Sequence, residues 1–173
     1  MGREVCRAVA ADPDLELAAA VDPHHSGLDV RQVTGVDVAG VQVEASPDAL
    51  TLAGVSVAVD FTDLAAAKGN LAWCAEHGVH AVVGTTGFTE ADLSAVRDMF
   101  PDGGPDGGRR AHCFIAPNFA IGAVLMMRFA QLAAPWFDSA EIIELHHDGK
   151  VDAPSGTAMA TARMMADASA SWG

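Results

Sequence analysis

Short apolar runs alternate with helical segments along most of the chain. Uninterrupted runs of β-branched and other apolar residues predict buried strands at positions 15–21, 55–60, 80–83 and 111–115. Helices are predicted between them, over residues 64–77 and 89–100, because Gly78 is a typical helix terminator and Thr89 with Asp92 resembles a capping box. Strands that alternate with helices in this way predict an α/β fold with a parallel sheet.

The two ends of the chain extend this pattern differently. Residues 1–11 read as a helix with no strand before it, whereas dinucleotide-binding folds open with a strand, a glycine-rich turn and then a helix. The later part predicts a helix over 121–134, stopped by Pro135 and with Met126 and Met127 as core residues, and then a strand over 139–145. The start of the chain therefore predicts a dinucleotide-binding sheet that lacks its first strand.

Composition and charge narrow the classes of partner. Half of the 173 residues are hydrophobic, which is enough for a sizeable core, and 10 basic against 23 acidic residues give a net charge of −13. Such a charge argues against binding to nucleic acid or to an anionic membrane surface. The three cysteines lack CxxC spacing and no apolar stretch is long enough to span a membrane, so we expect reduced thiols in a cytoplasmic protein.

Residues 144–157 hold the densest chemistry, reading Glu-Leu-His-His-Asp-Gly-Lys-Val-Asp-Ala-Pro-Ser-Gly-Thr. His146, His147 and Lys150 place two proton carriers and a cation in one loop. Ser155 is a natural N-cap for a helix over 157–168, so the residues that follow it sit where free N–H groups favour an anion. The plainer alternative is an exposed histidine pair and a helix cap without a ligand. A metal site is disfavoured because neighbouring histidines seldom face one ion.

This run resembles the signature of the dihydrodipicolinate reductase family, whose members use a nicotinamide cofactor to make tetrahydrodipicolinate on the bacterial route to diaminopimelate and lysine. Val-Asp-Phe-Thr at 59–62, His-Ala-Val-Val-Gly-Thr-Thr-Gly-Phe at 80–88 and Ile-Ala-Pro-Asn-Phe at 115–119 resemble the cofactor-side motifs of the family, in the same order. The resemblance implies an incomplete Rossmann-like dinucleotide-binding domain over 1–117. It also implies that an α+β substrate domain begins over 118–173.

The resemblance also implies roles for individual residues. His146 and Lys150 are expected to be catalytic, as a proton donor and as positive charge near the substrate nitrogen. His147, Gly156 and Thr157 are expected to hold the carboxylates of a small dicarboxylate substrate. The residues expected to bind NADH or NADPH are Gly2, Asp22, Phe61, Thr62, Gly84, Thr85, Thr86, Ala116, Pro117, Asn118 and Phe119. No metal is expected, and the family forms homotetramers.

Asp22 and Gly2 lie at the dinucleotide end of the pattern. Asp22 follows the glycine turn by about 20 residues, where a carboxylate accepts hydrogen bonds from the adenosine ribose, although it is equally a solvated carboxylate before Pro23. Gly2 matches the last glycine of the turn, and the earlier glycines are absent. We therefore expect a chain cut at both ends that, expressed alone, folds poorly and shows no NADH binding detectable by calorimetry. The alternatives are a non-catalytic remnant and another nicotinamide-dependent oxidoreductase, which the His-His-x-x-Lys loop argues against.

Overall fold

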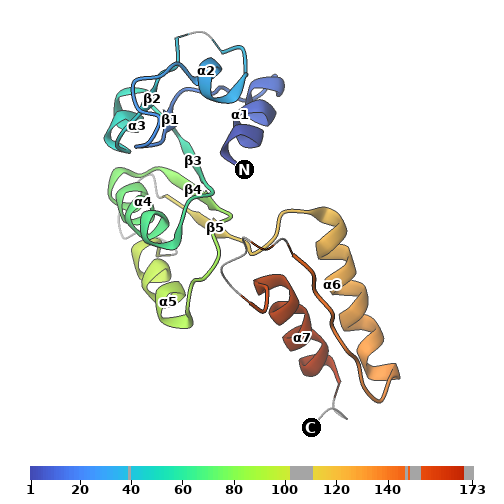
Figure 1. Ribbon diagram of the computed structural model, residues 1–173. Helices are drawn as coiled ribbons and strands as arrows, with labels where there is room; N and C mark the ends of the chain where they lie inside the picture. Colours follow the sequence, from blue (N-terminus) through green and yellow to red (C-terminus); the bar gives the residue numbers. More distant parts are fainter. Residues whose placement is uncertain (39, 102–110, 147, 149–152, 170–173) are drawn as a thin grey trace. The chain divides into compact units, whose positions relative to one another are not determined.

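A computed structural model describes residues 1–38, 40–101, 111–146, 148 and 153–169 of the chain. These residues form two compact units, Met1–Ile115 and Ala116–Gly173, and each is considered by itself. Helices and parallel strands make up the first unit, and helices dominate the second (Figure 1). The predicted mixed α/β class with parallel strands is confirmed. The assignment of residues 1–117 to dinucleotide binding and of 118–173 to substrate binding stays a prediction.

A three-stranded parallel sheet forms the centre of the first unit, with its strands in the order β3-β4-β5. The sheet and the helices that cover it are β3 (Val57–Asp60), α4 (Leu64–His77), β4 (His80–Val83), α5 (Glu90–Met99) and β5 (Cys113–Ile115). In the register of the sheet Asp60 lies opposite Val83, and Val83 lies opposite Ile115. The three strands therefore end together, and the residues that follow them leave the sheet at one edge.

Local signals set the ends of the two helices as predicted. The Asp63 side chain accepts hydrogen bonds from the first backbone N–H groups of α4, and Gly78 ends this helix at a φ of 69°, in the left-handed region that glycine tolerates best. Thr89 and Asp92 form the predicted capping box at the start of α5. Both helices thus follow from residues within one turn of their ends.

The core of the first unit lies on one face of the sheet. Leu71 and Cys74 of α4 and Val96 of α5 pack against Ala81 and Val83 of β4. The opposite face is open among the described residues of this unit. Its exposed side chains are Val57 at 47%, Val59 at 43% and Phe114 at 59%. The prediction that residues 55–60 form a fully buried strand was therefore wrong for this face, because an apolar run cannot report whether helices cover one side of a sheet or both.

A second, two-stranded parallel pairing precedes the main sheet. It joins β1 (Ala20–Val21) to β2 (Val43–Glu44), and the accompanying helices are α1 (Gly2–Ala11), α2 (Val30–Thr34) and α3 (Asp48–Leu52). The opening helix was predicted. The strand predicted over 15–21 is shorter than expected, because its partner β2 offers only two residues to pair with. The helix α2 was missed, although Asp29 and Gln32 form a capping box at its start.

The second unit is built around two helices. These are α6 (Ile121–Ala133), which continues into the short 3-10 turn η1 (Ala134–Trp136), and α7 (Gly156–Ala168), which packs against α6. Met127 is buried as predicted, but Met126 is 50% exposed, so its assignment to the core was wrong. None of the described helices combines the length and apolar character that a membrane crossing needs.

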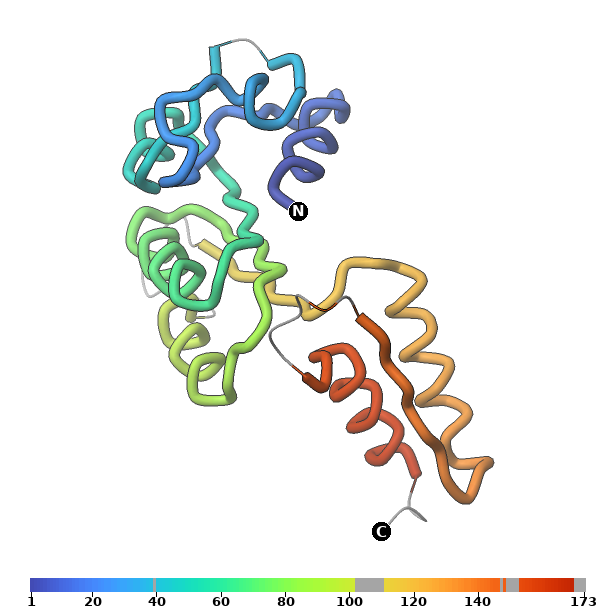
Figure 2. The backbone as a smooth tube through the Cα atoms, viewed as in Figure 1, coloured from blue at the N-terminus to red at the C-terminus, as the bar shows by residue number. Residues whose placement is uncertain are grey.

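The segment between η1 and the loop of residues 144–157 reverses direction and runs back as an extended stretch (Figure 2). We expected a strand over 139–145, and the described residues contain none there. A β-branched sequence becomes a strand only when another backbone pairs with it, and none of the described residues does so. Ile143 and Leu145 are accordingly 82% and 89% exposed.

Candidate functional site

Asp60 is the hub of the sheet edge in the first unit. Its Oδ1 atom accepts hydrogen bonds from the Thr62 backbone N–H at 3.0 Å, the Thr62 hydroxyl at 2.8 Å and the Thr85 hydroxyl at 2.8 Å. Its Oδ2 atom accepts one from the Asn70 amide of α4 at 2.7 Å. The carboxylate is 8% exposed, so these donors replace the water that it would otherwise bind. Asp60 therefore ties the residues after β3 to those after β4.

Gly84 allows the two connections to approach closely. A Cβ atom at this position would lie 2.0 Å from Cε1 of the Phe61 ring, which is far inside van der Waals contact. Only glycine lets the ring lie over the backbone at this point. Phe61 is half-buried and offers an apolar surface beside the ends of β3 and β4.

The three threonines of this edge differ in exposure. Thr85 is 6% exposed and its hydroxyl is engaged with Asp60, so its side chain supports the loops. Thr62 and Thr86 are exposed. The structure thus brings Phe61 and Thr62 together with residues 84–86 at one edge of the sheet. This was predicted, because neighbouring parallel strands end at the same edge.

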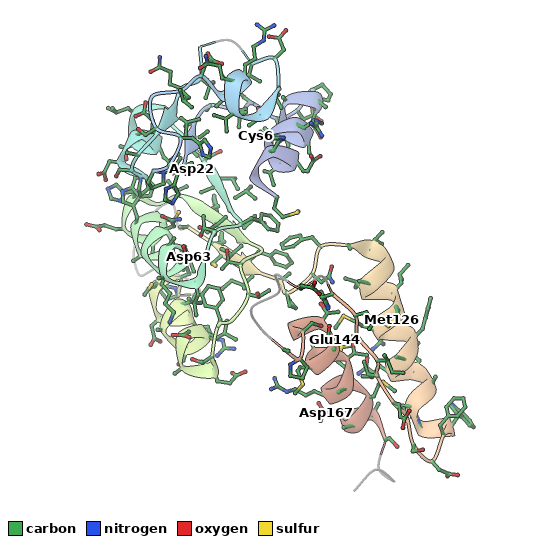
Figure 3. All side chains as sticks on the ribbon, viewed as in Figure 1. Cys6, Asp22, Asp63, Met126, Glu144 and Asp167 are labelled. Carbon is green, nitrogen blue, oxygen red and sulfur yellow. The ribbon has the colours of Figure 1, made fainter. Side chains whose placement is uncertain are left out.

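Asp22 follows β1 directly, and its side chain is 41% exposed (Figure 3). One carboxylate oxygen accepts a hydrogen bond from the His24 backbone N–H at 2.9 Å, and the other lies 2.7 Å from Nδ1 of His25. The hydrogen bond with His25 holds the pKa of Asp22 below its ordinary value. A carboxylate has about four acceptor positions, so two stay open to a ligand hydroxyl.

Gly2 is the first residue of α1, and a Cβ atom added there would contact nothing within 4 Å. No close approach in the described structure therefore requires glycine at this position. Its predicted contact with a dinucleotide rests on the resemblance alone.

Asn118 links the starts of the two helices in the second unit. Its Oδ1 atom accepts a hydrogen bond from the Ala120 N–H at 2.8 Å, immediately before α6, and its amide donates to the Thr157 hydroxyl at 3.2 Å. A hydroxyl that accepts this bond keeps its own proton to donate. Asn118 therefore connects the predicted cofactor motif at Ala116, Pro117 and Phe119 to the predicted carboxylate site.

The start of α7 presents free backbone donors. Ser155 is the N-cap as predicted, and its hydroxyl accepts a hydrogen bond from the Ala158 N–H at 3.1 Å. Among the described residues, the N–H groups of Gly156 and Thr157 have no hydrogen-bond acceptor. Unpaired N–H groups at the positive end of a helix dipole are suited to an anion such as a carboxylate.

Glu144 joins this helix start to His146. One oxygen of its carboxylate accepts a hydrogen bond from the Ser155 N–H at 2.9 Å, and the other makes an ion-pair contact with Nδ1 of His146. Glu144 is labelled in Figure 3 beside α7. Sequence reasoning missed this residue. The available signal was its spacing from His146, because residues two apart in an extended stretch point to the same side.

His147 and Lys150 lie outside the described residues. Within the described part of the chain, no group of three or more histidine, cysteine, aspartate or glutamate side chains is arranged to hold a metal ion. The described portion of the candidate site therefore consists of His146 with Glu144, and of Gly156 and Thr157 with Asn118.

Comparison with known proteins identifies the family. The family model described as dihydrodipicolinate reductase, N-terminus, matches residues 1–119, and the model of the C-terminus matches residues 122–171. A 4-hydroxy-tetrahydrodipicolinate reductase from Listeria welshimeri is 45% identical over 96% of this chain and 62% of its own length. The reductase from Streptomyces avermitilis is 45% identical over 97% of this chain and 57% of its own length.

A solved structure agrees with the sequence matches. The dipicolinate-bound dihydrodipicolinate reductase from Paenisporosarcina sp. TG-14 superposes with a TM-score of 0.73 at 36% identity, over 96% of this chain and 62% of that one. The chain thus spans about three fifths of the length of these relatives. Both family models match in order and together cover nearly the whole sequence, so the chain belongs to the dihydrodipicolinate reductase family.

Proposed function

We propose that the protein to which this chain belongs reduces 4-hydroxy-tetrahydrodipicolinate to tetrahydrodipicolinate with NADH or NADPH, in the diaminopimelate route of lysine biosynthesis. The observation that carries the proposal is the convergence of an imidazole and two free helix N–H groups at the start of α7. Family membership supplies the substrate and the reaction class.

The start of α7 is suited to a dicarboxylate. Gly156 and Thr157 offer backbone N–H groups, and the Thr157 hydroxyl is held by Asn118 with its own proton free to donate. His147 is assigned to the second carboxylate from the family motif. The dipicolinate in the related structure is itself a small aromatic dicarboxylate, which supports a ligand of this class.

His146 is assigned to proton donation. Its side chain is 40% exposed, so the ring can reach a bound ligand. Lys150 is assigned to the substrate nitrogen, where a fixed positive charge stabilises negative charge that develops during reduction. The protein residues thus bind the two carboxylates, supply one proton and balance charge at the nitrogen.

The residues at the sheet edge of the first unit fit a nicotinamide dinucleotide. Gly84 has no side chain, so its backbone is accessible beside the Phe61 ring. The side chains of Thr62 and Thr86 are exposed, and the Asp22 carboxylate retains acceptor positions for a ligand. When bound, the reduced nicotinamide supplies the hydride. The remaining residues assigned to this role are Gly2, Thr85, Ala116, Pro117, Asn118 and Phe119.

Assembly and location follow the family expectation. A homotetramer is consistent with the exposed apolar residues Phe129, Ile143 and Leu145 of the second unit. Light scattering of the purified protein measures the oligomeric state, and a monomer at micromolar concentration would contradict the assignment. The cytoplasm is proposed because Cys6, Cys74 and Cys113 are all free thiols.

A turnover assay tests the proposed reaction. The expected result is loss of reduced-nicotinamide absorbance only when the substrate is present, with turnover falling about 100-fold or more in His146→Ala and Lys150→Ala, which is the range for a positioned proton donor. Asp98→Asn, an exposed residue on α5, is the matched control and keeps the unmodified rate. Unchanged turnover in a variant with His146, His147 and Lys150 all replaced by alanine would refute the assignment.

A further inference from the structure

The Glu144 carboxylate lies between two partners of different kinds. One oxygen accepts from the Ser155 N–H at 2.9 Å, and the other contacts Nδ1 of His146. Glu144 is 24% exposed in its side chain, against 40% for His146. The more buried carboxylate therefore holds the more exposed ring.

These contacts fix the hydrogen-bonding states of both partners. A backbone N–H always donates, so the oxygen facing Ser155 is always an acceptor. An ionised carboxylate has no proton to give, so Nδ1 of His146 must carry the hydrogen in that contact. Neutral imidazole has a single N–H, and Nε2 is then the nitrogen that gains or loses a proton.

We propose that Glu144 is a positioning residue that holds His146 in the Nδ1–H tautomer, so that proton transfer runs through Nε2. The inference rests on the proposed function of His146 as proton donor. The protonated ring gives its Nε2 proton to the substrate, becomes neutral, and keeps its Nδ1 proton toward Glu144. The same carboxylate anchors Ser155, so the ring is set relative to the N–H groups of Gly156 and Thr157.

The simpler alternative makes Glu144 a clamp for the start of α7 and nothing more. A clamp needs only the contact with Ser155, and the tautomer of His146 would then not depend on Glu144. The two interpretations therefore differ in a quantity that can be measured without catalysis.

Nitrogen-15 NMR of the ring nitrogens of His146 in the full chain is the direct test. Its signals are assigned by their loss in His146→Gln and read at a pH where the ring is neutral. We expect the Nδ1–H form to dominate in the unmodified protein. In Glu144→Ala the ring should revert to the Nε2–H form, which a histidine side chain without a partner at Nδ1 prefers in water. An identical tautomer ratio in the two proteins would overturn the proposal.

Glu144→Gln is a sharper variant because it keeps the size of the side chain. The Ser155 N–H still requires an oxygen opposite it, so the new amide must turn its NH2 group toward His146. Nδ1 then has to accept, and the proton moves to Nε2. Retention of the Nδ1–H form in a folded Glu144→Gln protein also contradicts the proposal.

Ser155→Ala is the matched control for the helix start. It removes the hydroxyl that caps Ala158 and costs about 1 kcal/mol of stability, while the Glu144 contacts with the Ser155 backbone and with His146 remain. The unmodified tautomer is expected in this variant. A switch to Nε2–H here would overturn the proposal, because weakening of the helix start would then suffice to release the ring.

Turnover separates this proposal from the proposed function. Glu144→Gln should lower kcat about 10- to 100-fold with little change in KM, a part of the ~10²–10⁴ contributed by a positioned proton donor. A tautomer switch in Glu144→Gln together with full turnover in His146→Ala would uphold the positioning contact and refute the role of His146. A loss of turnover in His146→Ala without any tautomer switch in Glu144→Gln would do the reverse.

Discussion

Replacement of Asp60 tests whether one buried carboxylate holds the candidate cofactor edge together. Among its partners Thr85 is buried and Asn70 is half-buried, whereas Thr62 is exposed and regains water when the carboxylate is removed. Leaving a buried donor unsatisfied costs about 1–3 kcal/mol. With one buried and one half-buried donor left without this acceptor, Asp60→Ala should lower the free energy of unfolding of the first unit by about 2–4 kcal/mol.

Asp60→Asn should cost much less. The Asn side chain keeps one oxygen for Thr62 and Thr85, and the Asn70 amide can turn so that its oxygen accepts from the new NH2 group. The loss is then confined to the strength that the charge gave these bonds, about 1 kcal/mol. A larger loss of stability in Asp60→Ala than in Asp60→Asn therefore distinguishes a residue that organises hydrogen bonds from one that matters only through its charge.

Amide hydrogen exchange measures both effects. The Thr62 N–H donates directly to the carboxylate, and Val83 is the last residue of the central strand β4, with no exposed surface. A loss of 2–4 kcal/mol accelerates exchange limited by unfolding about 30- to 700-fold. Asp98→Asn removes one exposed acidic charge from the same unit and is the control. The reasoning fails if Asp60→Ala leaves exchange at Val83 within a few-fold of the unmodified protein, or if Asp60→Asn is as costly as Asp60→Ala.

Four further predictions concern other residues of the first unit. Burial raises the pKa of the Cys74 and Cys113 thiols to about 11, so alkylation of the folded protein at pH 8, followed by mass spectrometry, should be about 100-fold slower than for free cysteine. Because these pKa values are raised by folding, their stabilising contribution should be lost between about pH 9 and 11, which urea unfolding can follow. Hydrogen bonds from Lys68 of α4 and from Thr89 of the capping box lower the pKa of Asp92 to about 2. The free energy of unfolding should therefore decline as the pH falls from about 4 toward 2, and Asp92→Asn should remove this decline in urea unfolding. Gly84→Ala should cost about 1–3 kcal/mol through its collision with the Phe61 ring, and Phe61→Ala in the same chain should cancel most of that collision, as a double-mutant cycle would measure.

Elements with local start and stop signals could be predicted from the sequence. The bounds of α4 match their prediction because Asp63 and Gly78 act within one turn of the helix ends. The pairing of strands could not be predicted to the same accuracy. Residues 15–19 and 139–145 have the composition of strands, yet no described backbone pairs with them, and pairing depends on a partner remote in sequence.

In the candidate site too, local features could be predicted from the sequence, whereas contacts between residues remote in sequence could not. The order of residues in the loop and the N-cap at Ser155 could be predicted, because cap chemistry is local. The hydrogen bond between Asn118 and Thr157 joins residues 39 apart, and that between Ser155 and Glu144 joins residues 11 apart. Neither contact leaves a signal in hydrophobic periodicity, so the supporting residues of the site emerged only from the structure.

The contacts at the start of α7 also bear on how an acidic chain can hold a dianion. The chain carries a net charge of −13, and the Glu144 carboxylate binds the Ser155 N–H, immediately before the free N–H groups of Gly156 and Thr157. With His146 neutral, that carboxylate already occupies the positive end of the helix dipole and repels a second anion, whereas with His146 protonated the pair has no net charge. A dicarboxylate at this helix start is therefore better accommodated beside a neutral Glu144–His146 pair than beside a negative one.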